Sequence, residues 1–473
     1  MHEISVEKCI CNDRKHRETE GGSMIIPLPK KVNTIISTLT NAGFEAYAVG
    51  GCVRDTILGR TPGDWDITTS AKPDQIKQIF GRTVDTGIEH GTVTILIDKD
   101  GFEVTTYRID GEYKDARHPD SVIFTRSLIE DLKRRDFTIN AMAYNETEGL
   151  IDVFDGIKDL QKGIIRCVGD PYERFTEDAL RMMRAVRFAA QLGFTIEKST
   201  KDAICALSGS MAKISAERIQ VELVKLLISN HPEEIKTLYE TNITKVILPE
   251  FDLMMETPQN NKHHQYNVGE HTIESLKQIR ADKVLRLTML FHDVAKPASQ
   301  TTDHHGASHF YGHPKLGVVM AKAIFKRLKF DTDTTNRVLK LVEWHDDNPP
   351  VTPENIRKRM NRIGLEQYPY LFEVKRADVL AQSEYRRKEK LVYIDAYEKM
   401  YETILNNHEC VTLKDLAVSG KELIAIGMKP GKKIGETLDL LLELVLIEPN
   451  KNTKEFLMEY VRIRVETEKE NMQ

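Results

Sequence analysis

The 473-residue sequence lacks the marks of membrane-spanning and disulfide-stabilised proteins. No apolar run approaches the ~20 residues that a membrane-spanning helix needs, and the charged N-terminus has no apolar secretory core. The six cysteines are scattered and do not form a disulfide framework. These absences predict a protein of the reducing cytoplasm.

The sequence also lacks an excess of positive charge. Lysine and arginine number 67 against 72 aspartates and glutamates, so the formal net charge is −5 at pH 7. This balance disfavours a surface covered by nucleic acid, but it allows a local basic groove, because phosphate binding needs only a patch of positive charge. The length exceeds what one core supports, so we expect about three or four domains.

Helix and strand signals alternate early in the chain, and helix signals dominate after residue 155. Apolar spacing predicts a helix over Lys30–Ala42, a strand over Glu45–Val49 and a short helix over Cys52–Gly59. Thr92–Ile97 and Phe102–Tyr107 alternate like the two strands of a hairpin. The pattern predicts a mixed α/β part followed by an almost entirely helical part.

A glycine pair follows the first predicted strand. Gly50 and Gly51 let the backbone approach a phosphate, and free N–H groups at the start of the next helix favour an anion. Arg54, in the first turn of that helix, adds a fork of donors. Taken alone, the glycine pair is explained more simply by a tight turn.

Two aspartates spaced two residues apart follow the glycine pair. Asp64 and Asp66 are expected to begin a strand, where residues i and i+2 point to one face. Neighbouring carboxylates repel each other unless a cation lies between them, and Mg²⁺ prefers such oxygen ligands. Glu103, on a later strand, is either a third carboxylate near the metal or a salt-bridge partner of Arg108. Two-metal nucleotidyl transfer explains the set.

Several motifs between Met24 and Leu227 stand in an order that indicates a family. They are Gly-Gly-Cys-Val-Arg-Asp at 50–55, Asp-Trp-Asp at 64–66, Arg-Arg-Asp-Phe-Thr-Ile-Asn-Ala at 134–141, residues 152–166, and Glu-Asp-Ala-Leu-Arg at 177–181. On these motifs the chain resembles the class II tRNA nucleotidyltransferases and bacterial poly(A) polymerases. The resemblance implies an α+β fold, in which a polymerase-β-like nucleotidyltransferase palm with a mixed sheet precedes a helical neck, body and tail.

The resemblance also implies functional residues. Asp64 and Asp66 would bind Mg²⁺ and, with Glu103, form the expected catalytic set. Gly51 and Arg54, with Gly50 in the same turn, would contact the nucleotide. The incoming nucleotide would also meet five further side chains: Arg135, Asp178, Arg181, Arg184 and Arg187.

A helix predicted over Thr176–Gln191 places Asp178 and Arg181 on one face. The carboxylate accepts hydrogen bonds and the guanidinium donates them, which matches the pairing edges of cytosine and adenine. Uracil and guanine present a carbonyl to the carboxylate, and an unpaired buried acceptor costs about 1–3 kcal/mol. The alternative is an ordinary surface salt bridge. Arg187 should face away from Asp178 and either reach phosphate or brace the site.

The implied activity is template-independent addition of CMP and AMP from CTP and ATP to the tRNA 3′ end, with release of pyrophosphate. In this family, enzymes that add only CC lack a flexible loop after the third-carboxylate strand, and the polar segment Asp110–Val122 looks like this loop. An A-adding enzyme or a poly(A) polymerase is the alternative. The expected partners are tRNA, CTP and ATP, without a membrane or an obligate protein partner.

A second chemical group is rich in histidine, because eleven of the fifteen histidines fall between His231 and His408. An adjacent His-Asp pair at the end of an apolar helix is unfavourable in a hydrophobic core, but its two side chains are good metal ligands. The pattern resembles the HD phosphohydrolase domain, whose ligands match His271, His292, Asp293 and Asp378; those of its two-metal versions also match His313 and His345. The expected metal is a divalent transition metal or Mg²⁺. The substrate would be a phosphoester such as a damaged tRNA end, and a degenerate scaffold is the alternative.

These signals predict the domain order. A flexible extension (1–23) precedes the palm (24–150), a helical neck and a body that binds nucleotide and tRNA (151–250), the HD metal domain (262–383) and a helical tail (384–473). The tail contains a turn at 427–431 and is expected to grip the tRNA elbow. For the whole chain, a phosphohydrolase with a non-catalytic RNA-binding palm is the remaining alternative.

Overall fold

The computed structural model describes residues 24–111 and 122–470 and contains two compact units, which divide between Ile247 and Leu248. The extension predicted over 1–23 and most of the loop predicted over Asp110–Val122 lie outside the described residues. Within the described ranges, no helix is both long and apolar enough to cross a membrane.

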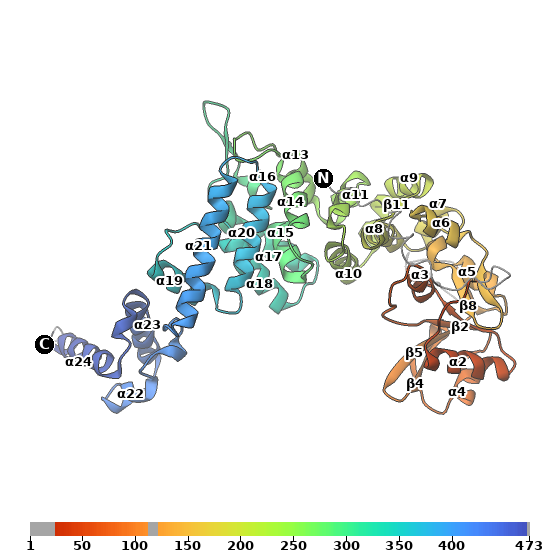
Figure 1. Cartoon of the computed structure of the whole chain (residues 1–473), viewed down its shortest axis with the longest axis horizontal. Helices are drawn as coiled ribbons and strands as arrows, with labels where there is room; N and C mark the ends of the chain where they lie inside the picture. Colours follow the sequence, from red (N-terminus) through yellow and green to blue (C-terminus); the bar gives the residue numbers. More distant parts are fainter. Residues whose placement is uncertain (1–23, 112–121, 471–473) are drawn as a thin grey trace. The chain divides into compact units, whose positions relative to one another are not determined.

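A seven-stranded sheet forms the frame of the first unit (Figure 1). In spatial order its strands are β3 (Thr83–Gly87), β4 (Thr92–Ile97), β5 (Asp100–Thr106), β2 (Ile67–Thr69), β1 (Ala46–Val49), β8 (Met142–Asn145) and β9 (Gly149–Asp152). β2 and β5 are parallel, and the other neighbours are antiparallel. The predicted hairpin is confirmed. The prediction that Asp64 and Asp66 begin a strand is wrong, because β2 starts at Ile67.

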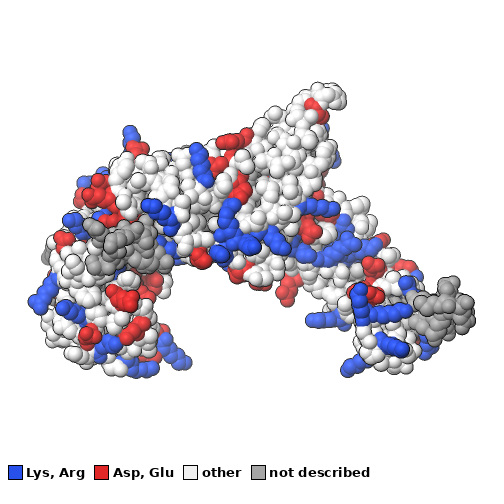
Figure 2. All heavy atoms as spheres, turned by 180° about the vertical axis from the view of Figure 1, so that it is seen from behind, with Lys and Arg blue, Asp and Glu red and all other residues white. Residues whose placement is uncertain are grey.

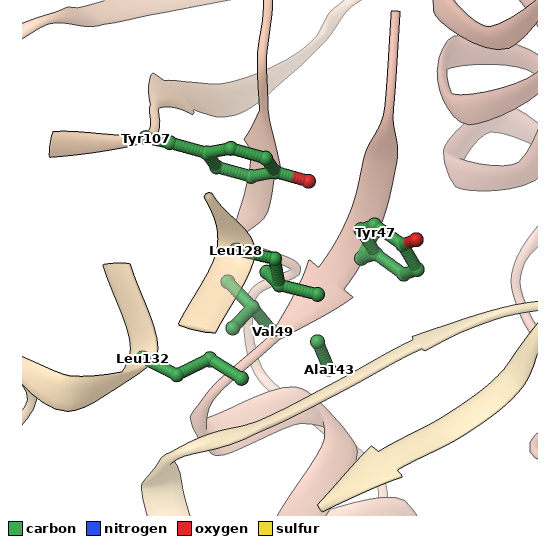
Figure 3. Packing of buried hydrophobic residues seen from close by; sticks show 6 residues of the cluster. All are labelled: Tyr47, Val49, Tyr107, Leu128, Leu132 and Ala143. Carbon is green, nitrogen blue, oxygen red and sulfur yellow. The ribbon is translucent and has the colours of Figure 1, made fainter. Parts of the chain in front are cut away.

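Helices pack on this sheet. α2 (Lys30–Asn41) contacts β1 and confirms the first predicted helix, and α3 (Gly51–Ile57) confirms the short helix after the glycine pair. Leu128 and Leu132 of α5 (Leu128–Lys133) form a buried cluster with Tyr47 and Val49 of β1, and Figure 3 shows these side chains together with Tyr107 and Ala143. This cluster fixes α5 beside the strand that leads into the glycine turn.

Helices also complete the first unit. They include α6 (Gly156–Lys162), α7 (Pro171–Glu177), α8 (Leu180–Leu192), α9 (Lys198–Leu207), α10 (Ala216–Leu227), α11 (Ile235–Glu240) and α12 (Thr244–Ile247). The prediction of a single helix over Thr176–Gln191 is wrong, because the backbone of Asp178 is extended (φ −140°, ψ 102°) between α7 and α8. Its carboxylate accepts the N–H of Leu180 at 3.1 Å. Aspartate competes with helix continuation in this way, because its side chain satisfies nearby backbone donors.

The second unit is almost entirely helical. Its central helices are α14 (Val268–Lys277), α15 (Lys283–Phe291), α17 (His313–Arg327), α18 (Thr332–Trp344), α20 (Tyr368–Ala381) and α21 (Arg387–Asn406). α20 packs against α14, α15, α18 and α21. Toward the C-terminus, α19 (Pro353–Ile363) packs on α23 (Lys432–Ile447), and the predicted turn separates α23 from α22 (Gly420–Ala425). α24 (Lys454–Glu470) follows.

Charge is distributed unevenly over the surface. In the view of Figure 2, Lys and Arg side chains gather in local groups on the surface, while Asp and Glu occur in scattered groups. The net negative charge therefore coexists with a local basic surface, as expected from the composition.

The contact between α8 and α10 depends on a buried ion pair. Arg187 Nε donates to Glu222 Oε2 at 2.5 Å, and both residues are buried. Glu222→Gln should lower the free energy of unfolding by about 3 kcal/mol, because it leaves a buried guanidinium without its counter-ion. Glu240→Gln breaks an exposed pair with Lys201 (2.8 Å) and should cost about 0–1 kcal/mol. Urea unfolding measures both; equal losses would contradict the assigned role of burial.

Candidate active site and candidate metal centre

Three carboxylates converge on the central strands β2 and β5, at the edge of the sheet where β2 begins. Asp64 and Asp66 immediately precede β2, and Glu103 lies on the neighbouring strand β5. Since β2 and β5 run parallel with Ile67 opposite Val104, Asp66 comes opposite Glu103 one residue earlier. All three residues are exposed to solvent. The structure thus brings the predicted catalytic set together.

The electrostatics of this edge favour a cation. The Asp66 side chain still contacts solvent, but the surrounding protein removes part of its hydration, and this raises its pKa. The negative charges of Asp64 and Glu103 raise the pKa of Asp66 further. Arg135 acts in the opposite direction and lowers this pKa. Carboxylates that repel each other can all stay ionised when a divalent cation lies between them, and such hard oxygen atoms suit Mg²⁺. The three residues therefore fit the predicted metal.

The glycine turn lies beneath Arg135. Gly50 has φ +84°, and a Cβ added there would lie 2.9 Å from Arg135 Nη1. Arg135 Nη2 lies 3.7 Å from the buried Asp131, and burial lowers the pKa of Arg135 while Asp131 and Asp66 raise it. Glycine is required at position 50 both by the backbone and by the passing guanidinium.

Arg54 braces the same turn. Its Nε and Nη2 donate to the two Asp55 oxygens at 2.9 Å each, and Nη1 donates to Asn140 Oδ1 at 2.6 Å. Asn140 in turn donates to Asp136 Oδ1 at 3.2 Å. Asp136 receives Arg184 Nε at 2.8 Å and Nη2 at 2.6 Å. A continuous, partly buried chain of polar contacts thus joins α3 to α8.

Three arginines of this region lie close to one aromatic ring. Phe188 of α8 lies 5.0 Å from Arg54, 5.3 Å from Arg184 and 3.9 Å from Arg187, measured from ring centroid to guanidinium carbon. Such placements favour cations. Arg187 is held by Glu222 of α10, so it lies in the contact between α8 and α10.

The prediction that Asp178 and Arg181 share one helix face is wrong, because Asp178 lies outside α8, which carries Arg181. The Asp178 carboxylate accepts Arg218 Nη1 at 3.3 Å and Nη2 at 2.8 Å, whereas Arg181 Nη1 donates to Glu177 at 2.7 Å. The three-residue spacing fails here because Asp178 lies between two helices. Sequence reasoning missed Arg218. No local spacing connects Arg218 with Asp178, because the two residues lie forty positions apart and Glu222 on the same helix pairs with Arg187 instead.

The second unit brings all six predicted HD residues together, at the ends and inner faces of its helices. They are His271, His292, Asp293, His313, His345 and Asp378. Two groups of ligand atoms share Asp293: one with His271 and His292, the other with His313 and His345. Asp293 Oδ2 lies 3.2 Å from His292 Nε2, and Asp293 Oδ1 lies 3.4 Å from His313 Nε2 and 3.7 Å from His345 Nε2. His271 Nε2 lies 2.9 Å from Asp378 Oδ1.

Hydrogen bonds at the far side of the imidazoles set their tautomers. The Nδ1 atoms of His292, His313 and His345 each lie 2.8 Å from a backbone carbonyl, which can only accept. In the neutral imidazole the proton then lies on Nδ1, and this tautomer leaves the lone pair of Nε2 available to a metal. The Nε2 atoms of His313 and His345 are 3.2 Å apart. Two facing lone pairs repel unless a cation lies between them, so this donor set fits one or two divalent metals.

Three family models match the chain. A poly A polymerase head domain matches residues 46–166, a model described as the probable RNA and SrmB-binding site of polymerase A matches 193–255, and a tRNA nucleotidyltransferase domain 2 matches 315–461. These matches follow the order of the predicted nucleotidyltransferase parts.

Curated relatives and solved structures agree with these models. A protein of Levilactobacillus brevis named CCA-adding enzyme is 38% identical over 87% of this chain and 92% of its own length. A Lactiplantibacillus plantarum protein of the same name is 61% identical over 42% of this chain, and this match spans only 49% of the relative. The structure of the Bacillus stearothermophilus CCA-adding enzyme in complex with CTP has a TM-score of 0.69 and 30% identity, covering 93% of this chain and 98% of that one.

The contribution of Asp136 to stability should depend on pH. Burial alone would raise its pKa, but contact with Arg184 lowers the pKa of Asp136 to about 2. A depressed pKa stabilises the fold above the unfolded value of about 3.9, and this stabilisation is lost as the pH falls toward about 2. Asp136→Asn should therefore lose stability against the parent chain at pH 7, with a gap that narrows below about pH 4, as urea unfolding would measure.

The exposed residue Asp202 provides the control, since Asp202→Asn should change stability by less than about 0.5 kcal/mol throughout. A gap for Asp136→Asn that stays constant from pH 7 to pH 3 would contradict the assigned ion pair.

Proposed function

The chain belongs to the family of CCA-adding enzymes, and from this we infer that it adds CMP and AMP from CTP and ATP to the 3′ end of tRNA without a nucleic-acid template. The observation that carries the proposal is the convergence of Asp64, Asp66 and Glu103 beside Arg135. The family is metal-dependent, so a divalent cation is expected at this edge. The predicted domain division remains part of the proposal.

The side chains of the sheet edge act mainly by position and charge. Asp64, Asp66 and Glu103 would hold Mg²⁺, which when bound activates a 3′-hydroxyl and offsets the charge of the triphosphate. Arg135 adds positive charge next to these carboxylates and suits the phosphates. The glycine turn allows the nucleotide to approach the backbone, and the α3 N-terminus offers free N–H groups. Arg54 and Arg184 hold this arrangement through Asn140 and Asp136.

Base selection would rest on Asp178 and Arg181. Asp178 can accept the amino group of cytosine or adenine, and Arg218 orients its carboxylate for this task. Arg181 can donate to a ring acceptor if it exchanges one of its present contacts, such as the one to Glu177. A carbonyl of uracil or guanine would face the carboxylate instead, at a cost of about 1–3 kcal/mol.

Incorporation on tRNA that ends at the discriminator base tests the proposal. With Mg²⁺ and both CTP and ATP, sequencing of the product ends should show a defined CCA. Asp64→Ala should lower incorporation by at least about 100-fold, the scale of losing one electrostatic contact to a transition state. Asp74→Ala, an exposed acid on α4 (Pro73–Ile79), should retain it. Extension by A alone, and only of tRNA that ends in CC, would indicate an A-adding enzyme. Products with long A tails would indicate a poly(A) polymerase.

A second function is favoured by the HD residues of the second unit. The shared Asp293 and the tautomers of three histidines support a one- or two-metal centre that hydrolyses phosphoesters. The mixture of imidazole and carboxylate suits a transition metal and also accepts Mg²⁺. A tRNA end with a terminal or 2′,3′-cyclic phosphate is a fitting substrate.

Metal analysis separates this function from the first. After dialysis against Mn²⁺, His345→Ala should bind less metal than the parent chain and should lose hydrolysis of 2′,3′-cyclic AMP, because one ligand group is broken. Nucleotide incorporation should be unchanged. His305→Ala, an exposed histidine outside the cluster, serves as the control. Equal metal content in parent and His345→Ala chains would remove the proposed centre.

A further inference from the structure

A second cavity opens beside the HD metal residues. It has a volume of about 730 Å³, and its wall includes His345, Asp346, Asp378 and Gln382, which also line the smaller pocket at the metal residues. We call it the side cavity. Inorganic phosphate would fill a small part of it, whereas cavities of about 300–1,000 Å³ take larger organic ligands. The side cavity is therefore sized for the organic portion of a phosphoester.

One cation in the side cavity forms no ion pair with the described residues. Lys390 Nζ contacts Gln382 Oε1 at 2.5 Å and His263 Nδ1 at 3.3 Å, both uncharged acceptors, and no carboxylate of the described residues pairs with it. The neighbouring Arg386 pairs with Glu389. Lys375 donates to the carbonyls of His345 and Asp347. Burial lowers the pKa of Lys390, whereas the charges of Asp378 and Asp346, which form no ion pair with it, act in the opposite direction.

A single carboxamide connects this ammonium to the metal residues. Gln382 Nε2 lies 3.1 Å from each oxygen of Asp378, and its Oε1 accepts from Lys390. An anion on Lys390 would therefore lie close to a phosphoester held at the HD residues. Between them the wall is partly apolar, with Val379 and Ile394. The Tyr393 ring is held there by its hydroxyl, which donates to the Pro349 carbonyl at 2.6 Å.

We propose that the side cavity binds the nucleoside of a substrate with two phosphate groups: one phosphate ester is hydrolysed at the HD residues, and the second phosphate is bound by Lys390. Both a free nucleoside bisphosphate and the last nucleotide of an RNA with a 3′-phosphate have this chemistry. In the reaction, a water oxygen forms a bond to phosphorus, the ester P–O bond breaks, and a proton passes to the leaving hydroxyl. The proposal rests on the phosphohydrolase function given above.

Binding without metal tests the side cavity independently of hydrolysis. Uridine 3′,5′-bisphosphate is the probe, because the proposed base selection rejects uracil at the nucleotidyltransferase site. In EDTA, equilibrium dialysis should show about 10-fold or more weaker binding to Lys390→Gln, the scale of a lost charge-assisted hydrogen bond. The binding of uridine 5′-monophosphate should be weakened less by the same substitution. Lys388→Gln, an exposed lysine on the same helix, should bind like the parent chain.

Hydrolysis in Mn²⁺ gives a second readout. Lys390→Gln should raise KM for the bisphosphate with little change in kcat, since Lys390 contacts the phosphate that does not react. An RNA oligonucleotide ending in a 3′-phosphate is the parallel substrate. If Lys390→Gln raises KM for the RNA alone, an RNA end is the ligand. If it raises KM for both substrates, the free nucleotide is sufficient.

The outcomes separate the two claims. Absence of all phosphoester hydrolysis, with binding that still depends on Lys390, would overturn the phosphohydrolase function and leave the binding site. Hydrolysis with identical KM values in the parent chain and Lys390→Gln, together with unchanged binding, would overturn the side cavity as a nucleoside site.

Discussion

The first unit depends on a partly buried chain of polar contacts from Asp55 through Arg54, Asn140 and Asp136 to Arg184. Buried charges are tolerated only when they are paired and hydrogen-bonded, so each link fixes the next one. Arg54 lies in the helix that begins at the glycine turn, and Arg184 lies on α8 near the proposed base-reading residues. These ion pairs therefore act together with the buried apolar residues of α8 in fixing the position of this helix.

The two proposed metal sites use different physical means to suit a cation. At the sheet edge, exposed carboxylates lie on a loop and a strand, where a long substrate can approach. In the second unit, His292 and His345 cap the C-terminal ends of α15 and α18. The last carbonyls of a helix lack partners, and here they accept the Nδ1 protons and turn the Nε2 lone pairs inward. Helix ends thus supply the orientation that a buried imidazole centre needs.

Much of both sites could be predicted from the sequence, because the spacing of nearby residues determines the strands and turns that carry many of the site residues. Alternation gave the strands, and the glycine pair with Arg54 marked the turn. The break at Asp178 was missed, because the helical pattern continues through it and only its partner Arg218, forty residues later, shows where the carboxylate points. Lys390 and Gln382 were missed for the same reason, since a cavity wall collects residues from separate helices. The six HD residues were predicted because a resemblance supplied the pairing that spacing could not.

The two proposed functions are chemically linked through the RNA 3′ end. Nucleotidyl transfer requires a free 3′-hydroxyl as the attacking group, so an end that carries a 3′- or 2′,3′-cyclic phosphate cannot be extended. Hydrolysis at the HD residues would restore that hydroxyl, and a pocket for the last nucleoside would direct this activity to nucleic-acid ends instead of small phosphates. The unpaired ammonium of Lys390 matters for this link, because a second phosphate distinguishes a terminal nucleotide in a chain from a simple phosphomonoester.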